Sequence, residues 1–211
     1  MTDVKPQRKQ YQSPRRSEQL DATRRRILEA ARRLFREKGY ANTTMREIAL
    51  ESGLAVPTVY KNFGNKRRLL LDLIDQTINS RVPPELETVL DQPTPRARVA
   101  ALAAMCVHLA SGAADVVAIL ISAAGADPQF AEMLTRMAEG RRRSDALVAR
   151  SLAQEGALRA DCTEEQATDV MYALAGPETY ELLVIRSGWS DEQFETWLSS
   201  TLAGSLLGVV P

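Results

Sequence analysis

The 211-residue sequence contains little cysteine or histidine. Its two cysteines, Cys106 and Cys162, lie far apart and neither belongs to a CxxC pair, so they support neither a disulfide framework nor a zinc cluster. His108 is the single histidine and has no second histidine or cysteine–carboxylate cluster at ligand spacing. We therefore expect no metal site and a reducing, cytoplasmic setting, with His108 either buried and hydrogen-bonded or placed inside a ligand pocket.

Familiar catalytic motifs are also missing. The sequence has no GxSxG, no P-loop and no dinucleotide-binding glycine fingerprint, and its histidine has no nucleophile nearby in sequence. We expect no enzyme, no catalytic residues and no cofactor, although residues distant in sequence could still converge in space.

One long apolar tract, residues 99–126, is the sole candidate for a membrane span. It is rich in alanine and is interrupted by His108, Ser111-Gly112 and Asp115. An aspartate in the middle of a bilayer is costly, so the tract favours two buried helices and no membrane partner. The first twenty residues have no apolar core and do not resemble a secretory signal; residues 1–19 are predicted to be a disordered basic arm.

Charge is balanced overall but segregated along the chain. Residues 1–70 hold 17 Lys and Arg against 7 Asp and Glu, a balance of +10, whereas residues 71–211 hold 10 against 20, a balance of −10. Such asymmetry indicates an N-terminal binder of nucleic acid or another polyanion, attached to an acidic body with a different role.

The basic segment has the pattern of four helices. The first runs from Asp21 to a stop at Gly39, because its apolar residues recur on one helical face. Thr44 and Glu47 have capping-box spacing and open a short second helix, which Gly53 ends. A third helix from about Ala55 to Phe63 follows after a tight turn, which is the layout of a helix-turn-helix. A fourth helix begins with Asn65 as its N-cap.

The acidic remainder also has a helical pattern. Proline interrupts it at residues 82–96, predicted to be a loop, and helices are expected over 96–111, 115–124 and 128–155, then after capping boxes at Thr163 and Ser190, with a kink at Gly176-Pro177. No segment shows sustained strand alternation. The fold class is therefore all-α, with about nine helices: residues 20–66 form a helix-turn-helix domain and residues 67–211 a helical bundle.

The second helix of the helix-turn-helix is the expected DNA-recognition helix. A helix fits the major groove, where its exposed side chains distinguish base pairs. Thr58, Tyr60 and Lys61 are its predicted contacts, because Val59 and Phe63 must face the core. Three further groups near helix N-termini are predicted to hold phosphates: Thr44, Arg46 and Lys66.

These residues resemble a known family. "LFREKGY", residues 34–40, followed by "TTMREIALESGLAVPTVYKNFGNKRRLL", residues 43–70, is similar to the DNA-binding region of TetR/AcrR-type transcriptional regulators, and the specific resemblance covers Asp21–Ile74. It implies DNA contacts by the six residues just named. It also implies a variable helical domain that forms an inducer pocket and dimerises through its last two long helices.

Three positions depart from the family pattern. Ala55 replaces the usual serine cap of the recognition helix, Pro57 the usual glycine and Asn62 a common aromatic residue. The missing cap is expected to cost about 1 kcal/mol, whereas Pro57 suits the first turn of a helix. Asn62 could lose a phosphate contact or read a base, so the operator sequence does not carry over from relatives.

The acidic domain offers two further sets of candidates. Apolar and adaptable side chains predicted to line a ligand pocket are Met105, His108, Leu109, Leu120, Met133, Met137 and Tyr172, although plain core is as good an account of each. Dimer anchors are predicted on the last two helices, with an internal core face as the alternative: Tyr180, Leu183, Val184, Trp197, Leu198 and Leu202. Arg141–Arg143 are expected on a solvated helix face.

The sequence thus predicts a cytoplasmic, nucleoid-associated transcriptional regulator. It would act as a homodimeric repressor on a pseudo-palindromic DNA operator and respond to an unidentified small-molecule effector. The alternatives are a helical interaction or adaptor protein without a DNA role and, less favoured, an enzyme.

Overall fold

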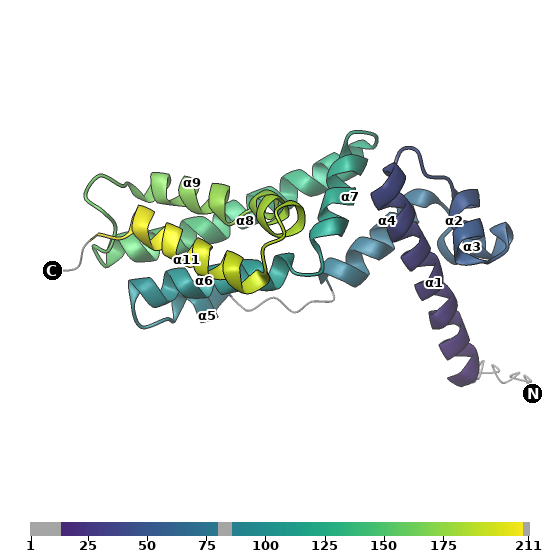
Figure 1. Cartoon of the computed structure of the whole chain (residues 1–211), viewed down its shortest axis with the longest axis horizontal. Coiled ribbons are helices and arrows are strands. Elements are labelled where there is room, and N and C mark those ends of the chain that lie inside the picture. The colour runs from purple at the N-terminus through teal and green to yellow at the C-terminus, as the bar shows by residue number, and fades with distance from the viewer. Residues whose placement is uncertain (1–13, 80–85, 209–211) are drawn as a thin grey trace, which may run out of the picture.

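The computed structural model describes residues 14–79 and 86–208, which are helical throughout apart from turns, bends and one isolated bridge between Leu158 and Leu207. Residues 1–13 of the predicted arm lie outside the described residues. Figure 1 shows an elongated molecule with α1 to α4 at one end and a bundle that contains α6, α8, α9 and α11 at the other. The prediction of an all-α fold is confirmed.

Helix α1 (Pro14–Lys38) begins earlier than its apolar period predicts. Residues 14–19, predicted to belong to the arm, are its first turns, and these turns project beyond the packed helices (Figure 1). Residues 18–22 are exposed. Because residues 18–22 bury no apolar face, hydrophobic periodicity does not reveal this part of the helix in the sequence.

Local caps fix the next three helices. α2 (Met45–Ser52) opens with the predicted capping box of Thr44 and Glu47 and ends at Gly53, whose φ of 64° places it in the left-handed region. α3 (Val56–Phe63) has Pro57 in its first turn and no side-chain cap from Ala55. α4 (Lys66–Ile74) has Asn65 as its N-cap, as predicted, and continues into the π-helix η1 (Asp75–Asn79).

The predicted proline-rich loop contains a short helix, α5 (Leu86–Leu90). Val89 is buried in the bundle core, with Leu86 and Leu90 packed beside it. These three residues lie on one helical face, and their packing against the bundle core stabilises this short helix. The prolines that flank it had predicted a loop.

The body consists of α6 (Pro95–Ala110), α7 (Ala114–Ala124), α8 (Pro128–Gln154), α9 (Glu164–Leu174) and α11 (Asp191–Leu206). The predicted capping boxes at Thr163 and Ser190 are both formed. The break at Gly176-Pro177 separates α9 from α10 (Pro177–Tyr180), which runs into a second π-helix, η2 (Glu181–Arg186).

Two apolar cores divide the molecule. The first joins α1 to α4 with α7 and with Phe130 at the start of α8; the second lies between α5, α6, α8, α9 and α11. Leu69, Leu70 and Leu73 of α4 belong to the first core, so this core continues past the predicted boundary at residue 66. Because α8 contributes to both cores, the helix-turn-helix and the bundle are mechanically connected.

In the described parts of the chain, no single helix has both the length and the apolar character of a membrane span. Only α6 and α7 taken together pass such a test, and they are bent by 70° at their junction.

Candidate nucleic-acid interface

The helix-turn-helix consists of α2, the Gly53 turn and α3. The amide of Gly53 donates to carbonyl oxygens of the last turn of α2, and the amide of Leu54 donates to Ala49 over 3.0 Å. The inward face of α2 carries Ile48 and Ala49, both fully buried. Arg26 of α1 supports the same turn, because its guanidinium donates to the carbonyl oxygen of Ser52 over 2.7 Å.

The recognition helix α3 has one buried and one exposed face. Val59 and Phe63 are buried, as predicted. Tyr60 leaves 49% of its surface exposed and Lys61 is exposed, whereas Thr58 is half-buried. Val56, exposed at the N-terminal end of α3, is a further candidate that the sequence reasoning missed, since N-terminal residues of a recognition helix reach base edges.

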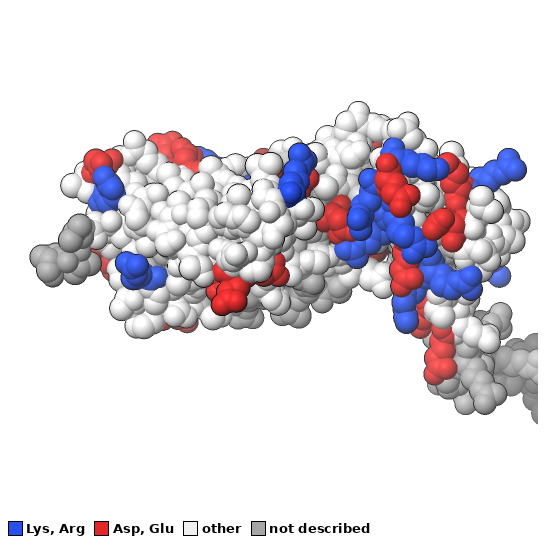
Figure 2. Space-filling model, in the orientation of Figure 1, with Lys and Arg blue, Asp and Glu red and all other residues white. Residues whose placement is uncertain are grey.

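Basic side chains gather over the N-terminal helices on the face shown in Figure 2, whereas the bundle displays few. Most of these cations have partners within the protein. Within residues 18–70, no ion pair or hydrogen bond engages three cationic side chains: Arg25, Arg46 and Lys61. Arg25 lies in a groove with Leu73 and Gly112, toward the body. Arg46 and Lys61 therefore remain as the unengaged cations of α2 and α3.

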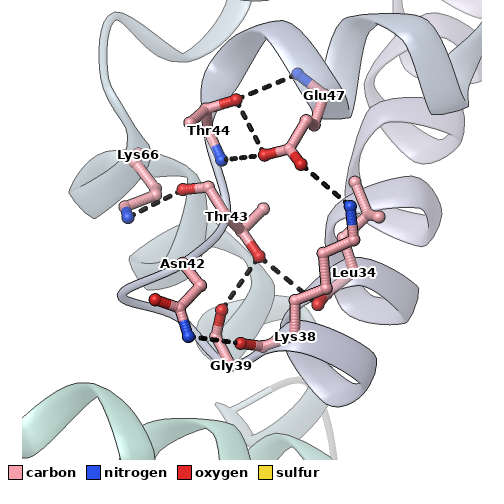
Figure 3. A network of polar contacts seen from close by, with 8 residues as sticks. All are labelled: Leu34, Lys38, Gly39, Asn42, Thr43, Thr44, Glu47 and Lys66. Atoms are coloured by element: carbon pink, nitrogen blue, oxygen red, sulfur yellow. Dashed lines mark hydrogen bonds and ion pairs between the residues drawn. The ribbon is translucent and has the colours of Figure 1, made fainter.

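Thr44 and Glu47 form a closed network at the start of α2 (Figure 3). The Thr44 hydroxyl donates to Glu47 over 2.8 Å, and the Glu47 carboxylate also accepts from Lys38 over 2.8 Å. Hydrogen bonds, first from Lys38 and then from Thr44, lower the pKa of Glu47 to about 2. Thr44 is exposed beside Arg46, but its hydroxyl already serves the helix cap.

Lys66, a predicted phosphate contact, has several partners within the protein. Its ammonium group donates to the carbonyl oxygens of Tyr40 and Thr43 over 2.7 and 2.8 Å, and to Ala41 over 3.3 Å. It also lies 4.4 Å from the centroid of the Tyr40 ring. The group thereby ties the start of α4 to the connection between α1 and α2.

Arg24 holds the C-terminal end of the recognition helix and was missed by sequence reasoning. It donates to the carbonyl oxygen of Asn62 over 3.0 Å, pairs with Asp72 of α4 and lies 4.5 Å from the Phe63 ring centroid. The Asn62 side-chain amide donates to Thr58 within α3 over 2.8 Å, so this amide is engaged in the free protein.

Two ion pairs join this unit to the body. Arg32 of α1 makes two hydrogen bonds, of 2.6 and 2.5 Å, to Asp115 at the start of α7. Arg67 of α4 contacts Asp127, the N-cap of α8, over 2.6 Å. Such pairs between residues about 60 to 83 positions apart leave no pattern in the sequence.

Comparison with known proteins agrees with this architecture. Residues 27–73 match the family model described as bacterial regulatory proteins, tetR family. The match covers the helix-turn-helix, so this part of the chain is similar to the DNA-binding region of that family. It is 29% identical to the uncharacterized HTH-type transcriptional regulator YdeS of Bacillus subtilis (strain 168), over 94% of this chain and 95% of that protein. Together with the helix-turn-helix, these similarities identify a DNA-binding transcriptional regulator.

Solved structures share its fold. The MbdR regulator from Azoarcus sp. CIB superposes with a TM-score of 0.71 at 19% identity, over 88% of this chain and 100% of that one. A putative transcriptional regulator from Saccharomonospora viridis in complex with choline gives 0.67 at 20% identity, over 89% and 99%.

The structure does not gather the seven predicted pocket residues. Leu120 is fully buried in the first core, with Met133 packed against it, whereas Met105 packs against the second core. The expectation of a buried histidine is wrong, because His108 is exposed. Three residues complete the set: Leu109 and Met137 are exposed, and Tyr172 is half-buried beneath Arg141.

The predicted dimer anchors divide between core and surface. Tyr180, Leu198 and Leu202 are buried inside the protomer, so they are not available to a partner in this conformation; here the alternative of an internal core face is correct. Periodicity reveals an apolar face but not what covers it. The other three anchors are half-buried against the second core: Leu183, Val184 and Trp197.

Proposed function

We propose that this protein is a homodimeric repressor that inserts α3 into the major groove of a pseudo-palindromic operator and releases it when a small molecule binds the bundle. Exposed Tyr60 and Lys61 on α3, with Arg46 on α2, carry this proposal. Two copies related by a two-fold axis would read half-sites about one helical turn apart, or a multiple of it. Such a regulator would act in the bacterial cytoplasm, at the nucleoid.

The direct test is a titration of labelled DNA from the gene's own upstream region at several salt concentrations. We expect saturable, sequence-dependent binding that weakens steeply with salt. Tyr60→Ala and Lys61→Ala should each reduce affinity, whereas Arg143→Ala, an exposed cation on α8, serves as the matched control. Equal binding of all DNA fragments, unchanged by the α3 substitutions, would contradict the proposal.

For the dimer, exposed apolar side chains near the C-terminus support a contact surface. Leu182 and Ile185 of η2 leave 54% and 60% of their surfaces exposed, next to the half-buried pair Leu183 and Val184. Exposed apolar side chains that lie together are typical of association surfaces. We expect Ile185→Arg to produce monomers in sedimentation equilibrium. Leu147→Arg, at an exposed leucine of α8, is the control; if it alone produced monomers, the interface would lie on α8 instead.

An effector role for the bundle is supported by its mechanical connection to the helix-turn-helix through α7, α8 and the two ion pairs described above. The structural relative in complex with choline supports a small molecule as the effector class. An effector needs only a higher affinity for the arrangement that does not bind DNA.

A further inference from the structure

Asp145 occupies a core position on α8. It precedes Val148 by three residues and Leu152 by seven, which is the spacing of one helical face, and both of these are fully buried. Asp145 is itself only 3% exposed. A carboxylate at such a position costs free energy unless another group pairs with it.

Among the residues that the structure describes, none forms an ion pair or hydrogen bond with the Asp145 carboxylate. Its Oδ2 atom is buried and accepts no hydrogen bond. The nearest arginines on α8 are engaged with α9: Arg141 lies 4.1 Å from the Tyr172 ring centroid and donates to the Tyr172 carbonyl over 3.0 Å, and Arg142 pairs with Asp169 over 2.6 Å.

Arg98 is a second buried charged residue of the bundle, and its partners can be compared with those of Asp145. It pairs with Glu155 over 2.8 Å and also donates to Gln92 and Ser151, so only its Nε atom lacks a partner. No comparable set of partners surrounds Asp145 among the described residues. Its lone carboxylate is therefore better explained by a partner that comes from outside the chain.

The surroundings of Asp145 suit an organic ligand. Burial together with the Asp145 charge raises the pKa of the Cys106 thiol of α6 to about 12, which keeps this thiol neutral. Burial raises the pKa of Asp145 itself to about 6, although Arg141 and Arg142 oppose the change. A nearby cation would favour the charged carboxylate.

The helical segment beside Arg141 is interrupted between the end of α9 at Leu174 and the start of α10 at Pro177. A Cβ atom at Gly176, between α9 and α10, would lie 2.6 Å from the Arg141 guanidinium, so a larger residue there would displace this side chain. The π-helix η2 follows directly, and π-helical turns are frequent at functional sites.

We propose that Asp145 is the recognition group for an organic cation, a protonated amine or quaternary ammonium on an apolar body, bound between α6, α8 and α9. The inference rests on the effector role proposed above. The cation supplies the direct ion pair that the buried carboxylate lacks, and the attraction is strong because the surroundings exclude water. The apolar body of the ligand packs against the second core.

The test uses the full chain and probes matched in shape. Benzylamine, benzyltrimethylammonium and tetraphenylphosphonium are the cations, and benzyl alcohol and benzoate are the neutral and anionic controls. Binding is followed by equilibrium dialysis and thermal shift. We expect the cations alone to bind, and Asp145→Asn and Asp145→Leu to weaken binding about tenfold or more. Glu132→Gln, at an exposed carboxylate of α8, should bind as the unmodified chain does.

The outcomes separate this proposal from the effector role. Equal cation binding by folded Asp145→Asn, or no binding of any cation, would overturn the site and leave DNA recognition untouched. Cation binding that depends on Asp145 but leaves operator affinity unchanged would support the site and contradict the effector role. Loss of operator affinity on cation binding, absent in Asp145→Asn, would support both.

Discussion

The ammonium group of Lys66 lies 2.7 Å from the carbonyl oxygen of Tyr40 and 4.4 Å from the centroid of the same residue's ring. A lysine at the start of α4 thus closes the connection between α1 and α2. The residue that the sequence marks as a phosphate contact is, in the free protein, a structural one.

Lys66→Ala is expected to destabilise the protein by about 1.5–3 kcal/mol, because three backbone carbonyls lose a charged donor. Urea unfolding measures this loss. A purely structural lysine leaves the slope of log affinity against log salt unchanged, whereas loss of a phosphate contact lowers that slope by about one. Lys66→Arg separates charge from geometry, since a planar guanidinium cannot reproduce the ammonium contacts.

Lys61→Ala should show the opposite pattern. Its side chain is exposed and unengaged, so the free energy of unfolding should change by less than about 0.5 kcal/mol. Operator affinity should fall, and the salt slope should drop by about one, if Lys61 meets a phosphate. A fall in affinity for one DNA sequence only, with an unchanged salt slope, would instead identify a base contact.

Asp115→Asn should loosen the junction between α1 and α7. Asp115 accepts two hydrogen bonds from Arg32, and the substitution removes the negative charge from this pair. Because the pair is partly exposed and screened by solvent, we expect the free energy of unfolding to fall by about 1–2 kcal/mol. Glu132→Gln, in an exposed pair on α8, is the matched control and should change stability little.

The same pair predicts an acid-dependent loss of stability. Burial raises the pKa of Asp115, but the hydrogen bonds and charge of Arg32 outweigh it and hold the pKa below its ordinary value. The stabilisation is therefore present above the unfolded-state pKa, about 3.9, and is lost as the pH falls through the folded-state pKa. Unfolding curves of Asp115→Asn should lack this acidic component; equal curves for the two proteins would contradict it.

For Asp145, the protein's stability is expected to depend on pH in the opposite sense, with stability lost as the pH rises. Its folded-state pKa of about 6 lies above the ordinary 3.8, so stability should fall as the pH rises through about 6. The linked loss is on the order of 2–3 kcal/mol by slightly alkaline pH. Asp145→Asn should flatten this part of the profile, measured by urea unfolding from mildly acidic to alkaline pH. An unchanged profile would mean that Asp145 ionises freely.

The first turn of α3 offers a test of local capping. Ala55 provides no side-chain acceptor, although its φ of −66° and ψ of 140° suit a cap residue. Ala55→Ser is expected to stabilise the protein by about 1 kcal/mol. Pro57→Gly is expected to destabilise it, because proline restricts the unfolded chain and fits the first turn. If Pro57→Gly left both thermal stability and operator affinity unchanged, the compensating role of Pro57 would be wrong.

Features with a short span along the chain were predictable. The capping boxes at Thr44, Thr163 and Ser190 join residues three apart, and the turn at Gly53 depends on one left-handed residue. The buried and exposed faces of α3 followed from the spacing of Val59 and Phe63. Such features depend on local backbone geometry, which the sequence specifies directly.

Contacts between distant segments were not predictable. The sequence alone determined an all-α chain with a basic helix-turn-helix and the residues that resemble the TetR family. Only the tertiary structure decided that Lys66 donates hydrogen bonds to the connection after α1 and that Leu198 and Leu202 face the protomer's own core. It also decided that Asp145 is buried with no hydrogen bond to its Oδ2 atom from the described residues. Helical periodicity shows which side chains share a face, but the packing of other helices decides whether that face is covered by the same chain, by a partner or by a ligand.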